Sequence, residues 1–316
     1  VQTRLDQLYQ AAKKEGQLVW SVSAVADTVK PVVAVFNRRF PDIKVSIVDL
    51  QATLVPQRIL TETAANRLTI DVVTANPVQL VPLGDRGLVL SHDFTGMGLP
   101  PERIGFDNRI LYTTDIIVAW FNNKNLVTAA DMPTKPEDLL NPKWKGKIVT
   151  DPGGASFTTF VPFWDDAKIE AFVKQMNDAG QIIPVTGNDQ IARIGRGEAA
   201  FGVVPVQRAT DTIAQGAPAE VMTVFPALKV QNGPLTIKGL PHPNAAELFY
   251  MWLSTPEAQD ALDKANSGLI TPCGPTPSDK LICGKKLTYN QQDTPEKVKH
   301  QADLSATLAK IIAQKG

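Results

Sequence analysis

The stretch QLVWSVSA at residues 17–24, taken together with IKVSIVDL at residues 43–50, decides the fold class. Both are short runs rich in Val, Ile and Leu, a composition typical of buried strands. Between them, residues 27–40 place valines and a phenylalanine at helical spacing and stop before Pro41. Strand, helix and strand in this order are typical of a mainly parallel sheet covered by helices. The sequence therefore predicts an α/β protein.

The same alternation of strand and helix patterns extends along the rest of the chain. Further strands are predicted at residues 71–75, 111–121, 147–151, 199–204 and 235–237. Further helices are predicted at residues 3–15, 54–67, 156–164, 168–180, 243–253, 256–266 and 296–314. No internal repeat or low-complexity run interrupts the pattern, so the strands and helices belong to ordinary globular lobes.

Two lobes are expected from the length of the chain. At 316 residues and 34.3 kDa it exceeds the usual size of one compact core. The long strand candidate LYTTDIIVAWF at 111–121 links two separate alternations, and we expect the chain to cross near 113–116 and to return near 224–228. The predicted boundaries are residues 1–113 plus 228–266 for lobe 1, and 114–227 plus 267–316 for lobe 2. Paired α/β lobes bind ligands in the crevice at the carboxyl ends of their strands.

Composition argues against several classes of function. Lys plus Arg and Asp plus Glu both number 32, so the basic excess that a nucleic-acid-binding protein uses against phosphates is missing. No window reaches the roughly 18–20 continuous apolar residues of a membrane span. The chain starts at Val1, which is compatible with a trimmed tag or with a signal peptide that has been removed.

The two cysteines, Cys273 and Cys283, lie in a stretch rich in Gly and Pro. A disulfide between them would close a short loop, add about 2–3 kcal/mol through loop entropy, and suit an oxidising compartment. The alternative is a pair of unrelated free thiols.

Four segments carry a resemblance to a known family, in the same order and spacing. They are AAKKEGQLVWS at 11–21, VFNRRFPDIKV at 35–45, PEDLLNPKWKGKIV at 136–149, and KGLPHPNAAELF at 238–249 followed by STPEAQ at 254–259. The set resembles the family-1 extracellular solute-binding proteins, the group that contains the bacterial ferric-ion-binding proteins.

This resemblance implies a two-lobed periplasmic binding protein fold of type II, in which two crossing strands act as the hinge. It implies a monomeric receptor, periplasmic or secreted, that closes over a small-molecule solute. The receptor then hands the solute to the membrane permease of an ABC importer. It needs no cofactor and has no nucleic-acid partner.

The strongest local candidate for a ligand site is TDPGGASFTT at residues 150–159, where a strand runs through a tight turn into a helix. Glycines let backbone approach a ligand closely, and a helix start offers unpaired N–H groups. Ser156 and Thr158 add hydroxyl donors, and Phe157 can stack on an aromatic ligand. The resemblance implies that this turn holds the ligand or a companion anion. The alternative is an ordinary helix N-cap.

Other short polar or aromatic residues lie where predicted strands end or helices begin. These further ligand-binding candidates are Ser21, Ser23, Asn76, Tyr112, Thr113 and Asn188. The serines and Asn76 follow strands of lobe 1, and the Tyr-Thr pair is expected on the floor of the cleft. The segment containing Asn188 resembles a family segment that supplies an anion contact. Loop chemistry and helix capping are the alternatives for all of them.

Gln207 and Arg208 decide the predicted class of solute. In the ferric-binding relatives, the strand that corresponds to 199–204 leads into two adjacent tyrosines whose phenolates bind iron. Aligned through GEAAF at 197–201, those tyrosines fall on Gln207 and Arg208. A guanidinium repels a metal cation but binds carboxylate, phosphate or phosphonate groups with two parallel hydrogen bonds. We therefore predict a small organic anion. The alternatives are a ferric or other metal receptor with non-tyrosine ligands, and a structural charge at Arg208.

Enzymatic motifs are missing from the sequence. The three histidines are far apart and lack the HExxH spacing of a zinc site, no serine lies in a nucleophile elbow, and no glycine-rich segment carries the phosphate-loop lysine. We predict no catalytic residues, no metal site and no cofactor. An enzyme on the same two-lobed scaffold is the remaining alternative, which turnover of a bound ligand would reveal.

Overall fold

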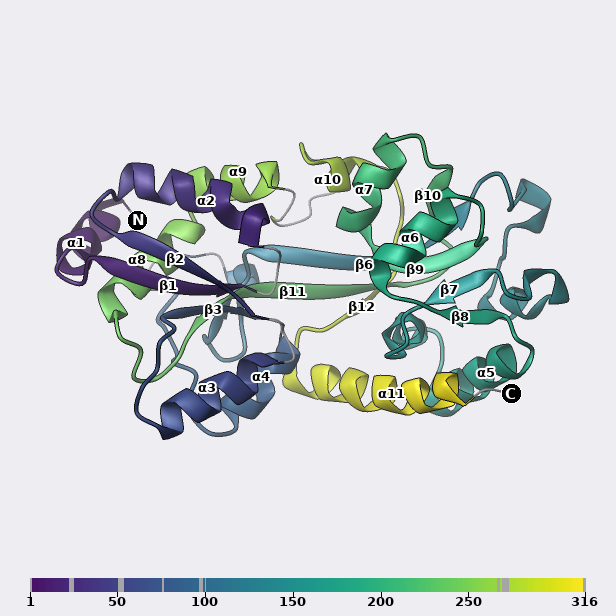
Figure 1. Cartoon of the computed structure of the whole chain (residues 1–316), viewed down its shortest axis with the longest axis horizontal. Helices are drawn as coiled ribbons and strands as arrows, with labels where there is room; N and C mark the ends of the chain where they lie inside the picture. Colours follow the sequence, from purple (N-terminus) through teal and green to yellow (C-terminus); the bar gives the residue numbers. More distant parts are fainter. Residues whose placement is uncertain are drawn as a thin grey trace. The chain divides into compact units, whose positions relative to one another are not determined.

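Two compact α/β units make up the chain in the computed structural model (Figure 1). The structure describes residues 2–22, 26–50, 54–75, 77–96, 99, 101–265, 268 and 273–314. Unit 1 comprises Val1–Asp115, Val230–Leu269 and Asp293–Pro295, and unit 2 comprises Ile116–Lys229, Ile270–Gln292 and Glu296–Gly316. Each unit is therefore assembled from segments that are distant in the sequence.

The sheet of unit 1 has the strand order β2, β1, β3 and β11. Strands β1 (Gln17–Val22), β2 (Lys44–Asp49) and β3 (Val72–Ala75) are parallel, as their Val- and Ile-rich sequences predict. Strand β11 (Ala227–Thr236) returns antiparallel to β3, with Leu235 opposite Val73. Because β1, β2 and β3 are parallel, their carboxyl ends meet at one edge of this sheet.

Helices cover both faces of the sheet in unit 1 (Figure 1). On one face, α1 (Gln2–Ala12), α2 (Ala26–Arg39), α8 (Pro243–Leu253) and α9 (Pro256–Lys264) form a core with β1. Phe36 is the centre of its aromatic cluster, with edge-on contacts to Phe249 and Trp252. On the other face lie α3 (Val55–Ala64) and α4 (Pro77–Gly84).

A buried carboxylate joins the sheet of unit 1 to α8. Asp71 is fully buried, and its two oxygens accept hydrogen bonds from the backbone N–H groups of Val19 (2.7 Å) and His242 (2.8 Å). The same carboxylate contacts Nδ1 of His242 at 2.9 Å. Since His242 directly precedes α8 and Asp71 directly precedes β3, this network holds the start of the helix against the amino end of the strand.

The sheet of unit 2 is also built around parallel strands. Strands β9 (Phe201–Pro205), β7 (Ile148–Thr150) and β8 (Ile182–Pro184) are parallel and adjacent in that order. Strand β6 (Thr114–Asn123) is antiparallel to β9, and β10 (Ala219–Val221) is antiparallel to β6. Strand β12 (Tyr289–Gln291) is parallel to the first residues of β11.

Helices cover both faces of this second sheet as well. The core on one face is formed with η6 (Ala155–Phe160), α5 (Asp166–Asp178) and α11 (Pro295–Ala313). The core on the other face is formed with α6 (Gly187–Gly195), α7 (Val206–Ala214) and the end of α10 (Pro277–Leu281). The remaining short elements are β4 (Ile104–Gly105), β5 (Ile110–Leu111), η2 (Pro101–Arg103), η3 (Ala129–Asp131), η4 (Pro136–Leu140) and η5 (Pro142–Trp144).

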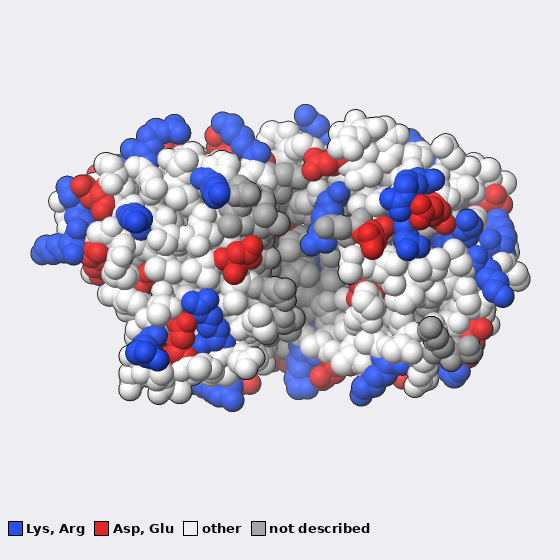
Figure 2. All heavy atoms as spheres, viewed as in Figure 1, with Lys and Arg blue, Asp and Glu red and all other residues white. Residues whose placement is uncertain are grey.

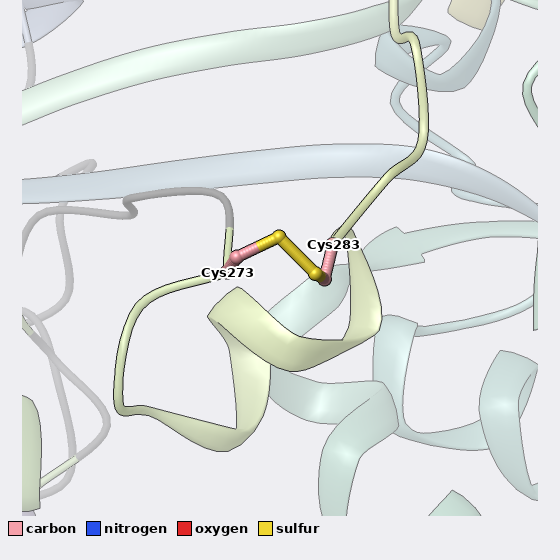
Figure 3. The surroundings of a disulfide bond; sticks show 2 residues. All are labelled: Cys273 and Cys283. Atoms are coloured by element: carbon pink, nitrogen blue, oxygen red, sulfur yellow. A yellow bond between two sulfur atoms is a disulfide. The ribbon is translucent and has the colours of Figure 1, made fainter.

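The predicted disulfide is present between Cys273 and Cys283, with an S–S distance of 2.01 Å (Figure 3). The closed loop contains α10, which begins with a capping box. Thr276 Oγ1 accepts from the N–H of Asp279, and the Asp279 carboxylate accepts from the N–H of Thr276, both at 3.0 Å. Ile282, next to the second cysteine, is buried in the core beneath α7. The disulfide thus ties a short helix to the core of unit 2.

Removing this disulfide is expected to lower the free energy of unfolding by about 2–3 kcal/mol, because the cross-link restricts the unfolded chain. The double substitution Cys273→Ser and Cys283→Ser should lower the urea midpoint of unit 2, and a reducing agent should lower the midpoint of the native protein equally. The double variant is the control for the reducing agent, to which it should not respond. Equal midpoints for the oxidised and reduced native protein would contradict the prediction.

Positive and negative side chains are interspersed over the visible face of each unit (Figure 2). This agrees with the equal numbers of basic and acidic residues in the sequence. Among the described helices, none combines the length and the hydropathy that a membrane crossing requires.

Candidate functional site

The carboxyl edge of the sheet in unit 2 brings together three segments predicted to bind ligand. Strands β7, β8 and β9 run parallel, with Thr150 opposite Pro184 and Val149 opposite Gly202. Each strand leads at this edge into a helix: β7 into η6, β8 into α6 and β9 into α7. The turn before Ser156, the start of α6 and the pair Gln207 and Arg208 therefore follow neighbouring strand ends. Such an edge is the usual ligand-binding position of an open α/β sheet.

The guanidinium of Arg208 lies against the first residue of α6. A Cβ atom placed on Gly187 would be only 2.8 Å from Arg208 Nη1, so a side chain at residue 187 would occupy the position of the guanidinium. Arg208 is exposed in the first turn of α7. Thr186, at the N-cap position of α6, makes no side-chain capping hydrogen bond. The positive end of a helix and a guanidinium lie side by side here, an arrangement that favours an anion.

The turn between β7 and η6 already contains a carboxylate of its own. Asp151 Oδ2 accepts from the backbone N–H and the hydroxyl of Ser156, each at 2.6 Å, and Oδ1 accepts from the N–H of Ala155 at 3.2 Å. The Ser156 hydroxyl in turn accepts from the N–H of Asp151. The Ser156 hydroxyl and the backbone N–H groups of the turn, which we predicted to bind an external anion, are thus bonded to Asp151 in this structure.

The helix predicted at residues 156–164 is wrong in type and in length. The structure has the 3₁₀ helix η6 at Ala155–Phe160 instead. Two hydroxyls contribute to the difference: Thr158 Oγ1 donates to the carbonyl of Ala155 and Thr159 Oγ1 to that of Ser156, both at 2.8 Å. Such bonds from a side chain to the carbonyl three residues earlier compete with α-helical backbone pairing.

Phe157 and Thr158 lie in the interior of unit 2. Both side chains are fully buried, and the ring of Phe157 packs edge-on against Trp120. The carbonyl of Thr158 accepts from Asn290 Nδ2 at 2.8 Å. These contacts give both residues a role in packing, whether or not they also contact a solute.

Gly154 allows α11 to pack against this turn. Its φ is +79°, in the left-handed region, and a Cβ atom would lie 2.6 Å from the carbonyl oxygen of Ser305 and 2.7 Å from Leu308 Cβ. Both of these residues belong to α11. The close approach that the glycine permits is therefore that of helix α11.

In unit 1, the predicted residues that the structure describes are buried. Ser21, the penultimate residue of β1, has 1% of its surface exposed, and its hydroxyl has no hydrogen-bond partner among the described residues. The backbone N–H of Thr113 donates to the carbonyl of Asn232 at 3.0 Å. Ser23 and Asn76 lie outside the described residues, as does the side chain of Asn188, whose backbone belongs to α6.

Tyr112 combines a buried ring with a hydroxyl that has no hydrogen-bond partner in the described part of the chain. Burial, with a smaller contribution from the negative charge of Asp293, raises the pKa of Tyr112 to about 12. Burial also raises the pKa of the Tyr250 phenol, which donates to the carbonyl of Pro234. Both phenols therefore resist the deprotonation that a phenolate–metal bond requires.

A metal site is not apparent in the described residues. Within them, no group of three or more His, Cys, Asp or Glu side chains is placed to hold an ion. The sequence contains four tyrosines, and no two of them are adjacent. A pair of phenolates from consecutive tyrosines is therefore not available in this chain.

The profile of a family described as bacterial extracellular solute-binding protein matches residues 32–276. Iron-bound HitA from Pseudomonas aeruginosa is 17% identical over 94% of this chain and 99% of that chain, with a TM-score of 0.74. The Trichodesmium protein IdiA (FutA), in complex with iron and citrate ligands, is 18% identical over 95% and 99%, with a TM-score of 0.73.

A third solved structure is the substrate-binding protein of the ABC transporter from Agrobacterium tumefaciens. It is 15% identical over 94% of both chains, with a TM-score of 0.74. Identities this low show a common fold, and they confirm the predicted type II binding-protein fold. No curated protein matches the sequence.

Proposed function

Because the chain belongs to the bacterial extracellular solute-binding proteins, we propose that it captures a small organic anion and delivers it to the membrane permease of an ABC importer. The anion carries a carboxylate, phosphate or phosphonate group. The observation that supports this proposal is the position of Arg208, whose guanidinium lies against the start of α6 at the carboxyl edge of the sheet in unit 2.

The chemistry of this edge suits a planar or tetrahedral oxyanion. A guanidinium presents paired N–H donors that match two oxygens of a carboxylate or phosphate. The N–H groups in the first turn of α6 carry the positive end of the helix dipole and add donors from a second direction. Both helices follow parallel strands of one sheet and pack on the same core, so the donors are held on a rigid frame.

Arg208→Ala is expected to weaken binding of the cognate anion by roughly 10- to 100-fold, in line with the loss of a charge-assisted hydrogen-bonded pair. Native mass spectrometry of the purified protein identifies a co-purified anion. Citrate, inorganic phosphate and methylphosphonate then serve as titrants in isothermal titration calorimetry.

Arg196→Ala is the matched control, because Arg196 is an exposed arginine at the end of α6 that pairs with Glu198. It should leave the dissociation constant unchanged. An unchanged constant for Arg208→Ala would remove this residue from the binding site.

A ferric receptor is the second candidate function, since two of the structural neighbours described above hold iron. The residues aligned with the iron-binding tyrosines are Gln207 and Arg208, and a guanidinium repels a bare ferric ion. A ferric complex of an organic anion would instead present carboxylates to Arg208. Titration with ferric chloride, with and without citrate, distinguishes these cases through a charge-transfer band in the visible spectrum. A strong band without citrate would contradict the anion proposal.

A further inference from the structure

A pocket lies within unit 1. It has a volume of about 110 Å³ and lies beside the C-terminal end of α4. Its walls are mainly apolar and are formed by Val81, Val89, Phe106 and Pro295. A cavity of this volume has room for a molecule of roughly seven to ten non-hydrogen atoms, judged from the space that one water needs.

Two side chains of opposite charge, Arg109 and Asp85, complete the lining. Within the described part of the chain, neither forms an ion pair or a side-chain hydrogen bond, with each other or with any other residue. Arg109 is half-buried, and its Nη1 lies 3.9 Å from the position that a Cβ atom on Gly84 would take. The guanidinium therefore lies beside the C-terminal end of α4, where the helix dipole favours a positive charge.

We propose that this pocket binds a free amino acid with an aliphatic side chain. The ligand carboxylate pairs with the guanidinium of Arg109, the ammonium group with the carboxylate of Asp85, and the side chain packs against the valines and Phe106. The two charged groups of the pocket cancel, so a zwitterion matches it. A simple anion would be repelled by Asp85, and a simple cation by Arg109.

The size of the pocket agrees with this class of ligand. Valine and leucine have eight and nine non-hydrogen atoms, within the roughly seven to ten that the cavity accepts. The proposal concerns residues of unit 1 alone and does not depend on the anion site at Arg208.

The test titrates the full chain with L-leucine by isothermal titration calorimetry. Two analogues each remove one charge: 4-methylpentanoate has no ammonium group, and 3-methylbutylamine has no carboxylate. Leucine should bind saturably, and each analogue should bind at least roughly 10-fold more weakly, because a charged group of the pocket is then left without its partner.

Substitutions locate the site. Arg109→Gln should weaken leucine binding by at least roughly 10-fold, and Asp85→Asn by a smaller factor, because Asp85 is exposed. Arg86→Gln is the matched control, since Arg86 directly follows Asp85 in the chain and donates to the carbonyl of Pro82. It should leave leucine binding unchanged, and so should Arg208→Ala. Thermal midpoints of all variants verify that they are folded.

Three results would overturn the proposal. They are absence of saturable leucine binding to the native protein, unchanged leucine binding by folded Arg109→Gln, and binding of 4-methylpentanoate as tight as that of leucine. Loss of leucine binding in Arg208→Ala with retention in Arg109→Gln would also overturn it, because the amino acid would then occupy the site of the proposed function.

Discussion

Gly154→Ala is expected to lower the free energy of unfolding of unit 2 by about 2–5 kcal/mol. Two costs add. The left-handed backbone at φ +79° costs an L-residue about 1–2 kcal/mol, and the new methyl group would collide with the backbone of α11. The colliding atoms are the Ser305 carbonyl oxygen, Leu308 Cβ and the Ala309 nitrogen, which cannot move without displacing the helix.

Two neighbouring glycines separate these costs when the urea midpoints of the variants are compared. Gly146 has a φ of +65° with nothing within 4 Å of the added atom, so Gly146→Ala should show the backbone cost alone. Gly153 lies in the same turn as Gly154 without a positive φ, and its added atom meets only the side chain of Asp151. The Asp151 Oδ1 atom, 3.1 Å from the added atom, also accepts from Ala155 and must shift slightly, so Gly153→Ala should have a small cost, below that of Gly154→Ala. A midpoint for Gly154→Ala equal to that of Gly146→Ala would show that α11 does not require the glycine.

Asp71→Ala is expected to destabilise unit 1 by about 3–5 kcal/mol, the typical cost of removing one partner from a buried hydrogen-bonded charge network. The backbone N–H groups of Val19 and His242 would lose their acceptor in the interior, and the imidazole of His242 would lose its partner. Buried donors without an acceptor retain the full cost of their lost hydration.

Urea unfolding, followed through tryptophan fluorescence, measures this effect. Asp42→Ala is the control. Asp42 also accepts a hydrogen bond, from the Tyr9 hydroxyl, and forms an ion pair with Lys13, but it lies at the surface. Its cost should be much smaller than that of Asp71→Ala, as is usual for an exposed ion pair. Asp71→Asn keeps one acceptor oxygen and should fall between the two. Equal midpoints for Asp71→Ala and Asp42→Ala would show that the buried network contributes no more than an exposed one.

Much of the fold could be predicted because its strands and helices have strong local patterns. The helix predicted at 243–253 coincides with α8, and the strand predicted at 17–24 contains β1. Strand β11 was predicted only at 235–237, because its middle reads as a polar loop with Gly and Pro. Its length is set by pairing with β3 and β12, which a local pattern does not contain.

The candidate site shows the same division between local and tertiary information. Parallel strands predict that the segments containing Ser156 and Arg208 share one sheet edge, and the sheet of unit 2 has this arrangement. The sequence did not indicate that Asp151 bonds the donors of the turn, nor that Arg208 lies against Gly187. Both depend on side-chain directions across a turn. Helix α7 was not predicted. Its apolar pattern in the sequence is weak, because only a few residues of its inner face, such as Val206 and Ala209, are buried.

The discontinuous make-up of the units also governs the order in which a growing polypeptide becomes competent to fold. The first 115 residues lack β11, α8 and α9, so the sheet of unit 1 stays open at one edge and bare on part of one face until residue 264 has been made. The core of unit 2 is completed even later in synthesis, since α11 supplies Leu304 and Leu308 to it. Biosynthesis is therefore nearly finished before either core is complete.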